Sequence, residues 1–366
     1  MKKNNTHSLY IHIPFCTNIC SYCDFPKLQF FRSFGEKYLS ILKSEVEEQV
    51  KTKDLRTIYI GGGTPTSLDD DLFLELLKIV EPYSKEVEEY TVEANPESLS
   101  LSKAKLMKEH GVNRVSIGVQ STNDDILVAI GRKHSFSDVK KAINNLKEVG
   151  IDNYNVDLIL GLPHVSKELL KKDLENIISL TPKHISTYSL TVHEHTVFGL
   201  NKVKEPEEDY AYELYKYVHE TLVKSGFSHY EVSNFSLPGY ESKHNLTYWR
   251  NEEYYGVGLG AASYINGVRY KNTDNFSKYL DGNYDREIEE LSLKDKLEYQ
   301  ILLNLRTLEG LDLSFLQKEF GVELLKEKKT QIDSYIKNGY LILKDNTLVP
   351  TFDGMMILDR IILDLI

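Results

Sequence analysis

Two kinds of hydrophobic pattern alternate along the first two thirds of the chain. Runs rich in Val, Ile, Tyr and Thr predict strands, and runs whose apolar residues recur every three or four positions predict amphipathic helices. The predicted strands are Ser8–Ile13, Thr57–Ile60, Glu89–Glu93, Arg114–Val119, Tyr154–Leu160 and His184–Thr191. The predicted helices between them are Phe34–Lys51, Leu72–Val80, Ser102–His110, Ser137–Val149 and Lys167–Ser179. Repeated strand-then-helix units predict parallel strands with right-handed crossovers, and therefore an α/β fold with a TIM-like partial (β/α)6 barrel.

The hydrophobic pattern changes near residue 290. The helices predicted there are Asp295–Arg306, Leu313–Glu319 and Glu323–Lys337, and a hairpin over Gly339–Val349 follows them. This order resembles a small α+β winged-helix-like domain. Because the segment is not distinctly basic, a structural cap on the barrel is favoured over a DNA-binding module. We therefore predict a barrel over residues 1–230, a connecting region over 231–290 and a C-terminal domain over 291–366.

Polar and glycine-rich clusters coincide with the ends of the first five predicted strands. A cysteine-rich loop follows the first strand, and Gly61–Thr66 follows the second. Glu93–Pro96 and Gly118–Ser121 end the third and fourth strands, and Asp157 lies in the fifth. The carboxyl ends of parallel strands lie at the same end of a barrel, so we expect these clusters to form one site.

Composition and charge narrow the class of protein. Among 366 residues, 41% are hydrophobic and 27% are charged, as in an ordinary globular protein. The net charge of −11 argues against a general nucleic-acid-binding surface. No apolar run reaches membrane-spanning length, because Asp359, Arg360 and Asp364 interrupt the apolar C-terminal tail. Clustered thiols are best preserved in a reducing compartment, so we expect a cytoplasmic protein.

The three cysteines of the chain, Cys16, Cys20 and Cys23, have the spacing C-x3-C-x2-C. Cysteine thiolates normally hold a [4Fe–4S] cluster in fours, so three leave one iron open to a ligand from outside the protein. An odd count disfavours disulfides. A structural zinc site would need a fourth ligand, such as His12 or Asp24, and the paired spacing of zinc modules is absent. We therefore expect an open [4Fe–4S] cluster.

The glycine run Gly61–Gly63 has neither the Gly-Lys-Ser/Thr of a phosphate loop nor the spacing of a dinucleotide fingerprint. With Tyr10–Phe15 and the C-x3-C-x2-C loop, however, Gly61–Thr66 resembles the radical S-adenosylmethionine (radical SAM) superfamily. Within it, the chain is similar to the branch that contains oxygen-independent coproporphyrinogen III oxidase and the heme chaperone HemW, from about Leu9 to the C-terminus. The resemblance implies a radical SAM barrel whose cluster binds S-adenosylmethionine at its open iron, the cofactors carrying the chemistry.

The resemblance also implies roles for individual residues. Tyr10 is expected beside S-adenosylmethionine, and the Glu93 carboxylate suits its ammonium group or its ribose hydroxyls. Gln120, Arg132 and Asp157 match positions that hold a second S-adenosylmethionine in the oxidase; alternatively, Arg132 is a surface charge and Asp157 a strand-end cap. The complete set of residues implied to bind S-adenosylmethionine is Tyr10, Tyr22, Gly62, Gly63, Thr64, Glu93, Gln120, Arg132 and Asp157.

Three features favour the chaperone side of this branch. Phe25 stands where the oxidase has a further cysteine, and few residues precede the first strand, so we expect no oxidase-like N-terminal extension. The third feature is an H-N-x-x-Y-W motif that is associated with heme in the family. Imidazole is a heme-iron ligand and aromatic rings offer flat apolar surface, although a purely structural histidine is the alternative. The residues expected to bind heme are His244, Asn245, Tyr248 and Trp249.

Two segments depart from the family pattern. Ala262 replaces a histidine in a glycine-rich run, and His193–Thr196 replaces a Glu-Pro-Gly-Thr segment. The histidines of the second segment are either substitute ligands or a sign of altered substrate handling. Because histidine pairs at i and i+2 in loops are more often solvent-exposed than metal-binding, they are not selected as ligands.

The sequence therefore predicts a heme chaperone that binds a [4Fe–4S] cluster, S-adenosylmethionine and heme. The alternative is an enzyme, oxygen-independent coproporphyrinogen III oxidase, which converts propionates to vinyl groups by radical decarboxylation. Whether the protein is an enzyme stays open at this point. The expected partners are heme or porphyrin, a heme-acceptor protein that can be membrane-associated, and an electron donor, with no nucleic acid among them.

Overall fold

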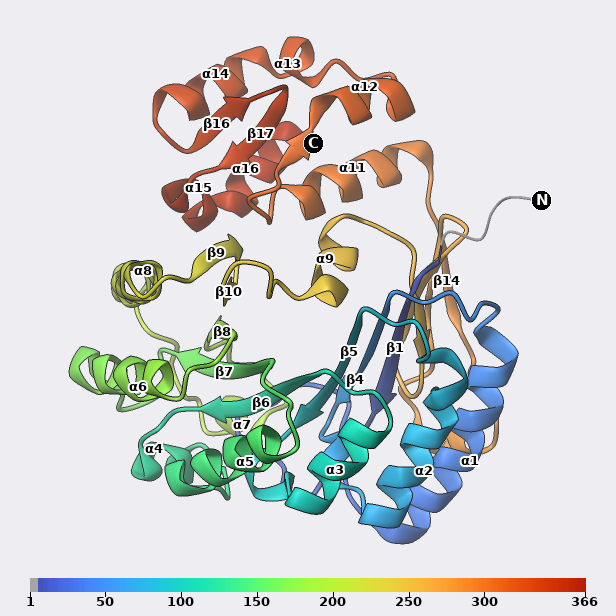
Figure 1. Ribbon diagram of the computed structural model, residues 1–366. Coiled ribbons are helices and arrows are strands. Elements are labelled where there is room, and N and C mark those ends of the chain that lie inside the picture. Colours follow the sequence, from blue (N-terminus) through green and yellow to red (C-terminus); the bar gives the residue numbers. More distant parts are fainter. Residues whose placement is uncertain (1–5) are drawn as a thin grey trace.

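The computed structural model describes residues 6–366; residues 1–5, at the start of the predicted barrel range, lie outside the described residues. A nine-stranded sheet forms the core, in the order β11-β1-β4-β5-β6-β7-β8-β10-β9. Its six central strands are parallel, as predicted (Figure 1). They are β1 (Ser8–Ile13), β4 (Thr57–Gly62), β5 (Glu89–Ala94), β6 (Arg114–Gln120), β7 (Tyr154–Leu160) and β8 (His184–Ser189).

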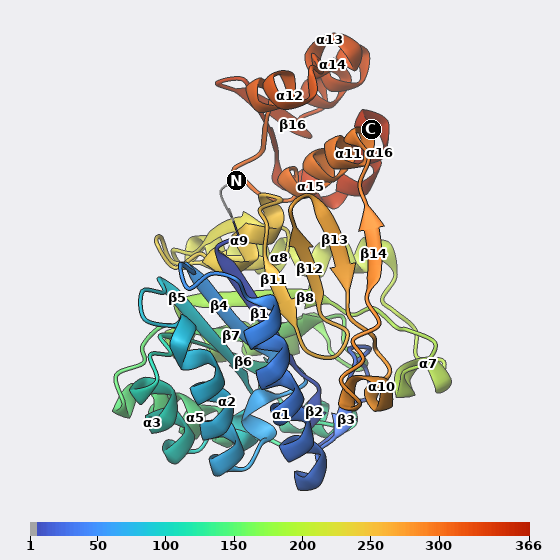
Figure 2. The ribbon, with the colours of Figure 1, turned by 90° about the vertical axis from the view of Figure 1, so that its right-hand side faces the viewer.

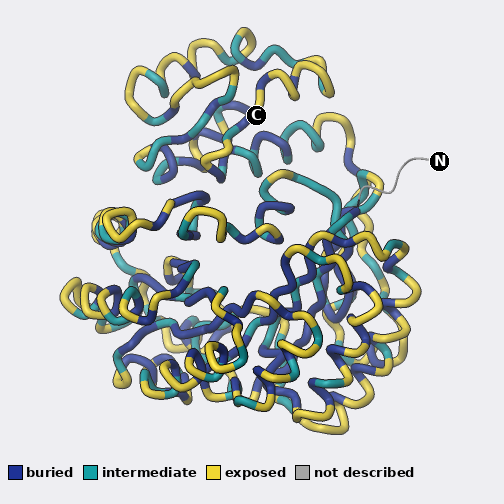
Figure 3. The backbone as a smooth tube through the Cα atoms, in the orientation of Figure 1, coloured by how far each residue is buried: buried dark blue, intermediate teal, exposed yellow. Residues whose placement is uncertain are grey.

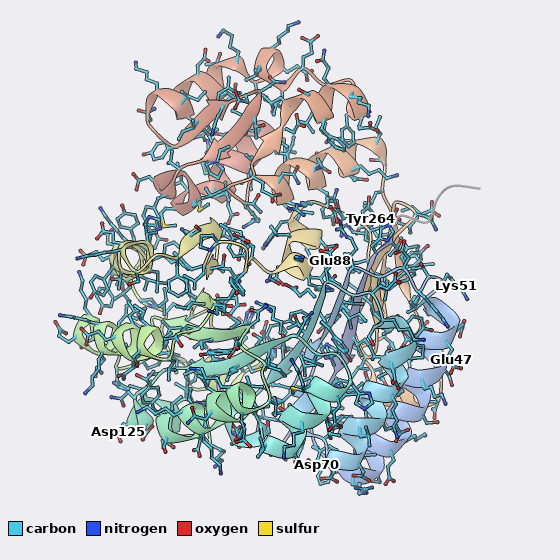
Figure 4. All side chains as sticks on the ribbon, viewed as in Figure 1. Glu47, Lys51, Asp70, Glu88, Asp125 and Tyr264 are labelled. Carbon is cyan, nitrogen blue, oxygen red and sulfur yellow. The ribbon has the colours of Figure 1, made fainter. Side chains whose placement is uncertain are left out.

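Amphipathic helices cover the outer face of these strands. They are α1 (Arg32–Gln49), α2 (Asp70–Val80), α3 (Leu101–Glu109), α4 (Asp124–Ala129), α5 (Phe136–Glu148) and α6 (Lys167–Ser179). In α5 the buried residues recur at helical spacing, and a capping box of Ser135 and Asp138 begins the helix. Figure 3 shows the strands buried along most of their length and the helices exposed on their outer side. Charged side chains such as Glu47, Asp70 and Asp125 lie on that outer surface (Figure 4).

Short strands from distant parts of the chain extend both edges of the sheet, and the sequence pattern did not predict them. β11 (Tyr255–Val257) pairs in parallel with β1, whereas β10 (Asn234–Ser236) pairs antiparallel with β8 and with β9 (Ser228–Glu231). α7 (Val197–Leu200) and α8 (Glu208–Lys224) connect β8 to β9. Strands of three or four residues carry too little alternation to be recognised from sequence.

A second sheet lies beside β11 and α1 (Figure 2). Its strands are β12 (Ala262–Ile265), β13 (Val268–Lys271) and β14 (Glu287–Glu290), and α10 (Phe276–Leu280) precedes the last. Asn266 and Gly267 join the first two strands with positive φ angles of 54° and 75°, the Asn-Gly turn typical of tight hairpins. Because β10 and β11 belong to the main sheet, part of the segment 231–290 packs with the barrel; the predicted domain boundaries stay a prediction.

The C-terminal residues form a small domain with its own hydrophobic core. Its elements are α11 (Leu293–Asn304), β15 (Leu311–Asp312), α12 (Leu313–Phe320), α13 (Leu324–Glu327), α14 (Lys329–Lys337), β16 (Leu341–Lys344), β17 (Thr347–Pro350), α15 (Phe352–Met356) and α16 (Leu358–Leu365). The predicted third helix is divided at Lys328, and the hairpin turns at Asp345 and Asn346 as expected. In Figure 2 this domain lies at the end of the barrel opposite α7, β2 (Phe15–Cys16) and β3 (Leu28–Gln29). Among residues 6–366, no helix has the length and apolar character needed to span a bilayer.

Candidate functional site

A cavity of ≈ 450 Å³ lies at the carboxyl ends of the parallel strands. Eleven of the residues that the sequence analysis selected line it together, although they come from six segments of the chain. They are Cys16, Cys20, Tyr22, Cys23, Gly62, Gly63, Thr64, Glu93, Gln120, Arg132 and Asp157. The parallel strands bring them to one end of the barrel, as the strand-end clusters predicted.

The loop that carries the cysteines is fixed to the barrel by backbone hydrogen bonds. The Phe30 N–H donates to the carbonyl of Cys16 (2.9 Å), which joins the short strands β2 and β3. The Ser21 N–H donates to Ile130 (3.1 Å), and the Ser21 carbonyl accepts from the Phe198 N–H (2.9 Å) in α7. The three thiols are therefore presented by an ordered loop.

Burial and a neighbouring arginine set the charge state of the thiols. Burial raises the pKa of the Cys16 thiol to about 11 and raises the pKa of Cys23, so these groups are neutral thiols unless a positive charge compensates them. Arg132 supplies one positive charge, because its Nη1 lies 3.5 Å from the Cys20 Sγ. Iron ions supply far more, and a coordinating thiol is deprotonated outright. The donor set thus fits an iron–sulfur cluster.

Within residues 6–366, no three His, Cys, Asp or Glu side chains are grouped closely enough to hold a single metal ion. A four-iron cluster does not require its ligands to meet at one point, because each thiolate binds a separate iron. Three cysteines around one cavity suit such a cluster better than a lone zinc ion.

The glycine run makes room for protein groups at the cavity wall. A Cβ at Gly61 would lie 2.7 Å from the Glu93 carboxyl carbon, and one at Gly62 would lie 2.4 Å from the His12 ring. Gly62 also has a φ of +111°, which L side chains rarely adopt. Its N–H donates to Glu93 Oε2 (3.0 Å), while the Tyr59 hydroxyl donates to Glu93 Oε1 (2.7 Å). The run therefore holds the Glu93 carboxylate in place.

Burial raises the pKa of Glu93 to about 7, and the negative charge of Asp157 contributes. We expect S-adenosylmethionine to bind more tightly as the pH rises through 7, because ionised Glu93 attracts its ammonium group. Glu93→Gln should bind it more weakly and lose that part of the pH dependence. Calorimetric titrations of both proteins below and above pH 7 measure this; a pH profile that is the same in both would contradict the role of Glu93.

Two side chains at the cavity wall carry polar atoms that have no partner within residues 6–366, namely Gln120 Oε1 and Arg132 Nε. Gln120 adopts a left-handed φ of 70°, a strained conformation that is common at binding sites. Arg132 is buried, donates to Asn95 Oδ1 (2.9 Å) and also contacts the Gly118 carbonyl. Unsatisfied buried groups favour a polar ligand, so the wall fits the carboxylate and hydroxyls of S-adenosylmethionine. The alternative of a surface charge does not describe Arg132.

Arg132→Met should lower the reduction potential of the cluster. In the unmodified protein, the guanidinium group of Arg132 donates to the Cys20 sulfur, and this positive charge stabilises the more negative, reduced state of the cluster. A redox titration followed by electron paramagnetic resonance measures the potential. Lys133→Met, at the exposed neighbouring position, is the control. An unchanged potential in Arg132→Met would show that the contact does not act on the cluster.

Asp157 and Tyr10 lie within strands β7 and β1, not at their ends. Burial raises the pKa of Asp157, whose Oδ1 accepts from Asn155 Nδ2 (2.6 Å) within β7, so it is not a strand-end cap. The Tyr10 hydroxyl is 2.9 Å from His12 Nδ1, and Tyr10 is not among the lining residues of the cavity. Contact of Tyr10 with S-adenosylmethionine stays a prediction.

The H-N-x-x-Y-W motif lies at the other end of the barrel, in α9 (Lys243–Trp249). His244 is buried, its Nδ1 is 2.8 Å from Thr57 Oγ1 at the start of β4, and its Nε2 is 2.8 Å from the Tyr248 hydroxyl. The Trp249 carbonyl accepts from Asn304 Nδ2 (2.8 Å) in the C-terminal domain. Both ring nitrogens of His244 are thus engaged, and burial lowers its pKa to about 3. Heme binding by His244, Asn245, Tyr248 and Trp249 stays a prediction, and this arrangement is the one expected of a structural histidine.

Several lining residues were not selected from the sequence as binding residues, among them Asn95, Lys27 and Tyr188. His193, which also lines the cavity, was named only as a possible substitute ligand. Asn95 directly follows β5, which contains Glu93. Its position at the end of a strand was the sequence feature that could have identified it as a lining residue. Tyr188 and His193 likewise lie at or just after the end of β8. Leu190 and Thr191, in the same segment, also line the cavity.

Comparison with known proteins agrees with this site. The radical SAM superfamily matches residues 10–177, and the HemN C-terminal domain matches residues 291–357. The heme chaperone HemW of Lactococcus lactis subsp. lactis (strain IL1403) is 40% identical, over 98% of either chain. HemW of Bacillus subtilis (strain 168) is 39% identical, over 96% of either chain. The structure of coproporphyrinogen III oxidase (HemN) from Escherichia coli has the same fold, with a TM-score of 0.85 and 20% identity over 99% of this chain and 90% of that one.

The cysteine loop, the glycine run and the barrel fold are thus accompanied by similarity to HemW proteins over nearly the whole chain. The chain belongs to the radical SAM superfamily and, within it, to the family of the heme chaperone HemW.

Proposed function

We propose that this protein is a heme chaperone, which binds heme and transfers it to an acceptor protein. The observation that carries the proposal is the near full-length similarity to proteins named heme chaperone HemW, at 40% and 39% identity. The solved structure of the oxidase supports the fold alone, because only 20% of the aligned residues are identical. Phe25, which stands in place of the oxidase's further cysteine, also supports the chaperone rather than the decarboxylating enzyme.

In this proposal, Cys16, Cys20 and Cys23 hold the [4Fe–4S] cluster, and the cavity beside them binds S-adenosylmethionine. The residues of the wall that would hold it are Tyr22, Gly62, Gly63, Thr64, Glu93, Gln120, Arg132 and Asp157. Tyr10, which does not line the cavity, is also expected to contact it. When bound, these cofactors supply one-electron chemistry, and an electron donor is then required. The protein contributes position and charge: Glu93 meets a cationic group and Arg132 an anionic one.

We also propose the cytoplasm as the compartment, because free thiols that serve as cluster ligands persist where disulfides are disfavoured. The acceptor is a hemoprotein, which can be membrane-associated. The division of the chain into barrel, connecting region and C-terminal domain at residues 230 and 290 belongs to the same proposal.

Two measurements test the proposal together. Anaerobically reconstituted protein should bind hemin at a one-to-one ratio, seen as a saturable change of the Soret band. With S-adenosylmethionine, a reductant and coproporphyrinogen III, mass spectrometry should detect no decarboxylated porphyrinogen. Decarboxylated product would identify an oxidase, and the absence of saturable hemin binding would contradict the chaperone function.

A further inference from the structure

The cavity at the carboxyl ends of the strands has a partly exposed rim. Phe25, with 62% of its surface exposed, and Tyr188, with 44%, both line the cavity while facing solvent. The His193 side chain, which is 42% exposed, lines it as well. Val197 and Leu200, in the adjacent α7, add exposed apolar surface. The rim therefore combines flat and apolar side chains with an imidazole.

His193 lies beside a carboxylate of the cysteine loop. Its Nε2 lies 3.1 Å from Oδ2 of Asp24, the residue that follows Cys23. Within residues 6–366, no hydrogen bond involves His193 Nδ1. Histidines that ligate metals almost always bond their other ring nitrogen to a carboxylate, a carbonyl or water, which fixes the ring and its tautomer. Asp24 places a carboxylate beside Nε2 that can take this role, and it leaves Nδ1 for a ligand.

The backbone of His193 is hydrogen-bonded within its own loop, and that loop is joined to the cysteine loop through α7. The His193 carbonyl accepts from Thr196 Oγ1 (2.7 Å) and from the Thr196 N–H (3.0 Å). Thr196 also caps α7, whose Phe198 donates to the Ser21 carbonyl and packs against Tyr22 (ring centroids 6.4 Å apart). A preorganised ligand loses less entropy on binding than a mobile one.

The histidine of the H-N-x-x-Y-W motif lacks these properties, because His244 is buried and both of its ring nitrogens are engaged. We propose that heme is held at the cavity rim, with His193 as a ligand of its iron and Phe25 against a face of the porphyrin. This inference rests on the proposed function and assigns its binding site. It places heme at the end of the barrel that carries the cysteines.

A lysine at the same rim suits the propionates of heme. Lys27 lines the cavity, and its ammonium group donates to the carbonyls of Cys23 (2.5 Å) and Phe25 (3.2 Å). An ammonium group has three donors, so one remains for a carboxylate. The rim thus offers an iron ligand, an apolar face and a positive charge, the three features that an anionic metalloporphyrin requires.

Hemin titration of His193→Ala tests the site directly. We expect affinity to fall at least tenfold and the Soret band to shift, because removing the ligand removes the iron–nitrogen bond. Adding free imidazole should restore the band position. His195→Ala, at the exposed position two residues further on, is the matched control and should bind hemin as the unmodified protein does. Iron and sulfide contents should be equal in all three proteins.

Asp24→Ala should lower hemin affinity by about tenfold while leaving histidine ligation visible in the electron paramagnetic resonance spectrum, since it removes only the partner of the ligand. If His193→Ala binds hemin with unchanged affinity and spectrum, the assigned site is wrong although the chaperone function stands. If the unmodified protein itself fails to bind hemin saturably, both the proposed function and this inference fail.

Discussion

Replacing Cys20 by alanine should leave the protein without a cluster after anaerobic reconstitution. Two thiolates cannot retain a cluster that usually requires four. Cys20 also accepts the Arg132 contact, so its loss removes one of the hydrogen-bond acceptors of that buried guanidinium group. Iron and sulfide analysis and the brown colour of the reconstituted protein measure the loss, which should be complete.

Thr17→Ala is the matched control for this experiment. Thr17 is exposed in the same loop, and only its backbone groups take part in hydrogen bonds within the described residues. It should retain the full iron content, and circular dichroism should show that both variants are folded. A Cys20→Ala protein that keeps the iron and colour of the unmodified protein would disprove the ligand assignment.

Of the substitutions proposed here, Glu45→Ala should lower the free energy of unfolding the most. Glu45 lies in α1 with no exposed surface and accepts hydrogen bonds from the Gly258 N–H (2.9 Å), Asn272 Nδ2 (2.6 Å) and the Tyr279 hydroxyl (2.6 Å). Arg286 Nη2 lies 3.6 Å away. Alanine would leave a charge and three donors unsatisfied in the interior, at a cost of about 3–5 kcal/mol. Urea unfolding of the two proteins measures the difference.

Glu47→Ala is the control, because this residue lies two positions further along α1 on its exposed side (Figure 4). It should change the free energy of unfolding by less than about 0.5 kcal/mol. Glu45 joins α1 to the chain after β11, the strand that extends the barrel beyond β1. Equal stabilities of the two variants would show that this network does not hold the edge of the barrel.

The central strands and their helices followed from local pattern, whereas the edges of the barrel did not. β7 and α6 coincide with their predicted ranges because their apolar residues repeat regularly over seven and thirteen residues. β11 has only three residues, and it is a strand because it pairs with β1, for example Gly256 with Tyr10. The two strands are far apart in the sequence. Such non-local pairing leaves no periodic signal in the chain.

The candidate site shows the same division. From the cysteine spacing and the glycine run, these residues could be predicted to share one cavity. Residues that directly follow parallel strands all lie at the same end of the barrel. The bond from Tyr59 to Glu93 depends on the register between β4 and β5, which no motif records. The H-N-x-x-Y-W motif gave residue types suited to heme, but whether His244 is free or buried depends on how α9 packs against the start of β4.

Heme transfer tests the central claim most directly. Reconstituted protein loaded with one equivalent of hemin is mixed with membranes from a heme-deficient bacterium, and heme arriving on the membranes is followed with time. As a chaperone, the protein should deliver heme at a rate that rises with membrane concentration and exceeds delivery from a hemin–albumin complex. Heme that remains on the protein, or that reaches the membranes no faster than from albumin, would contradict the account.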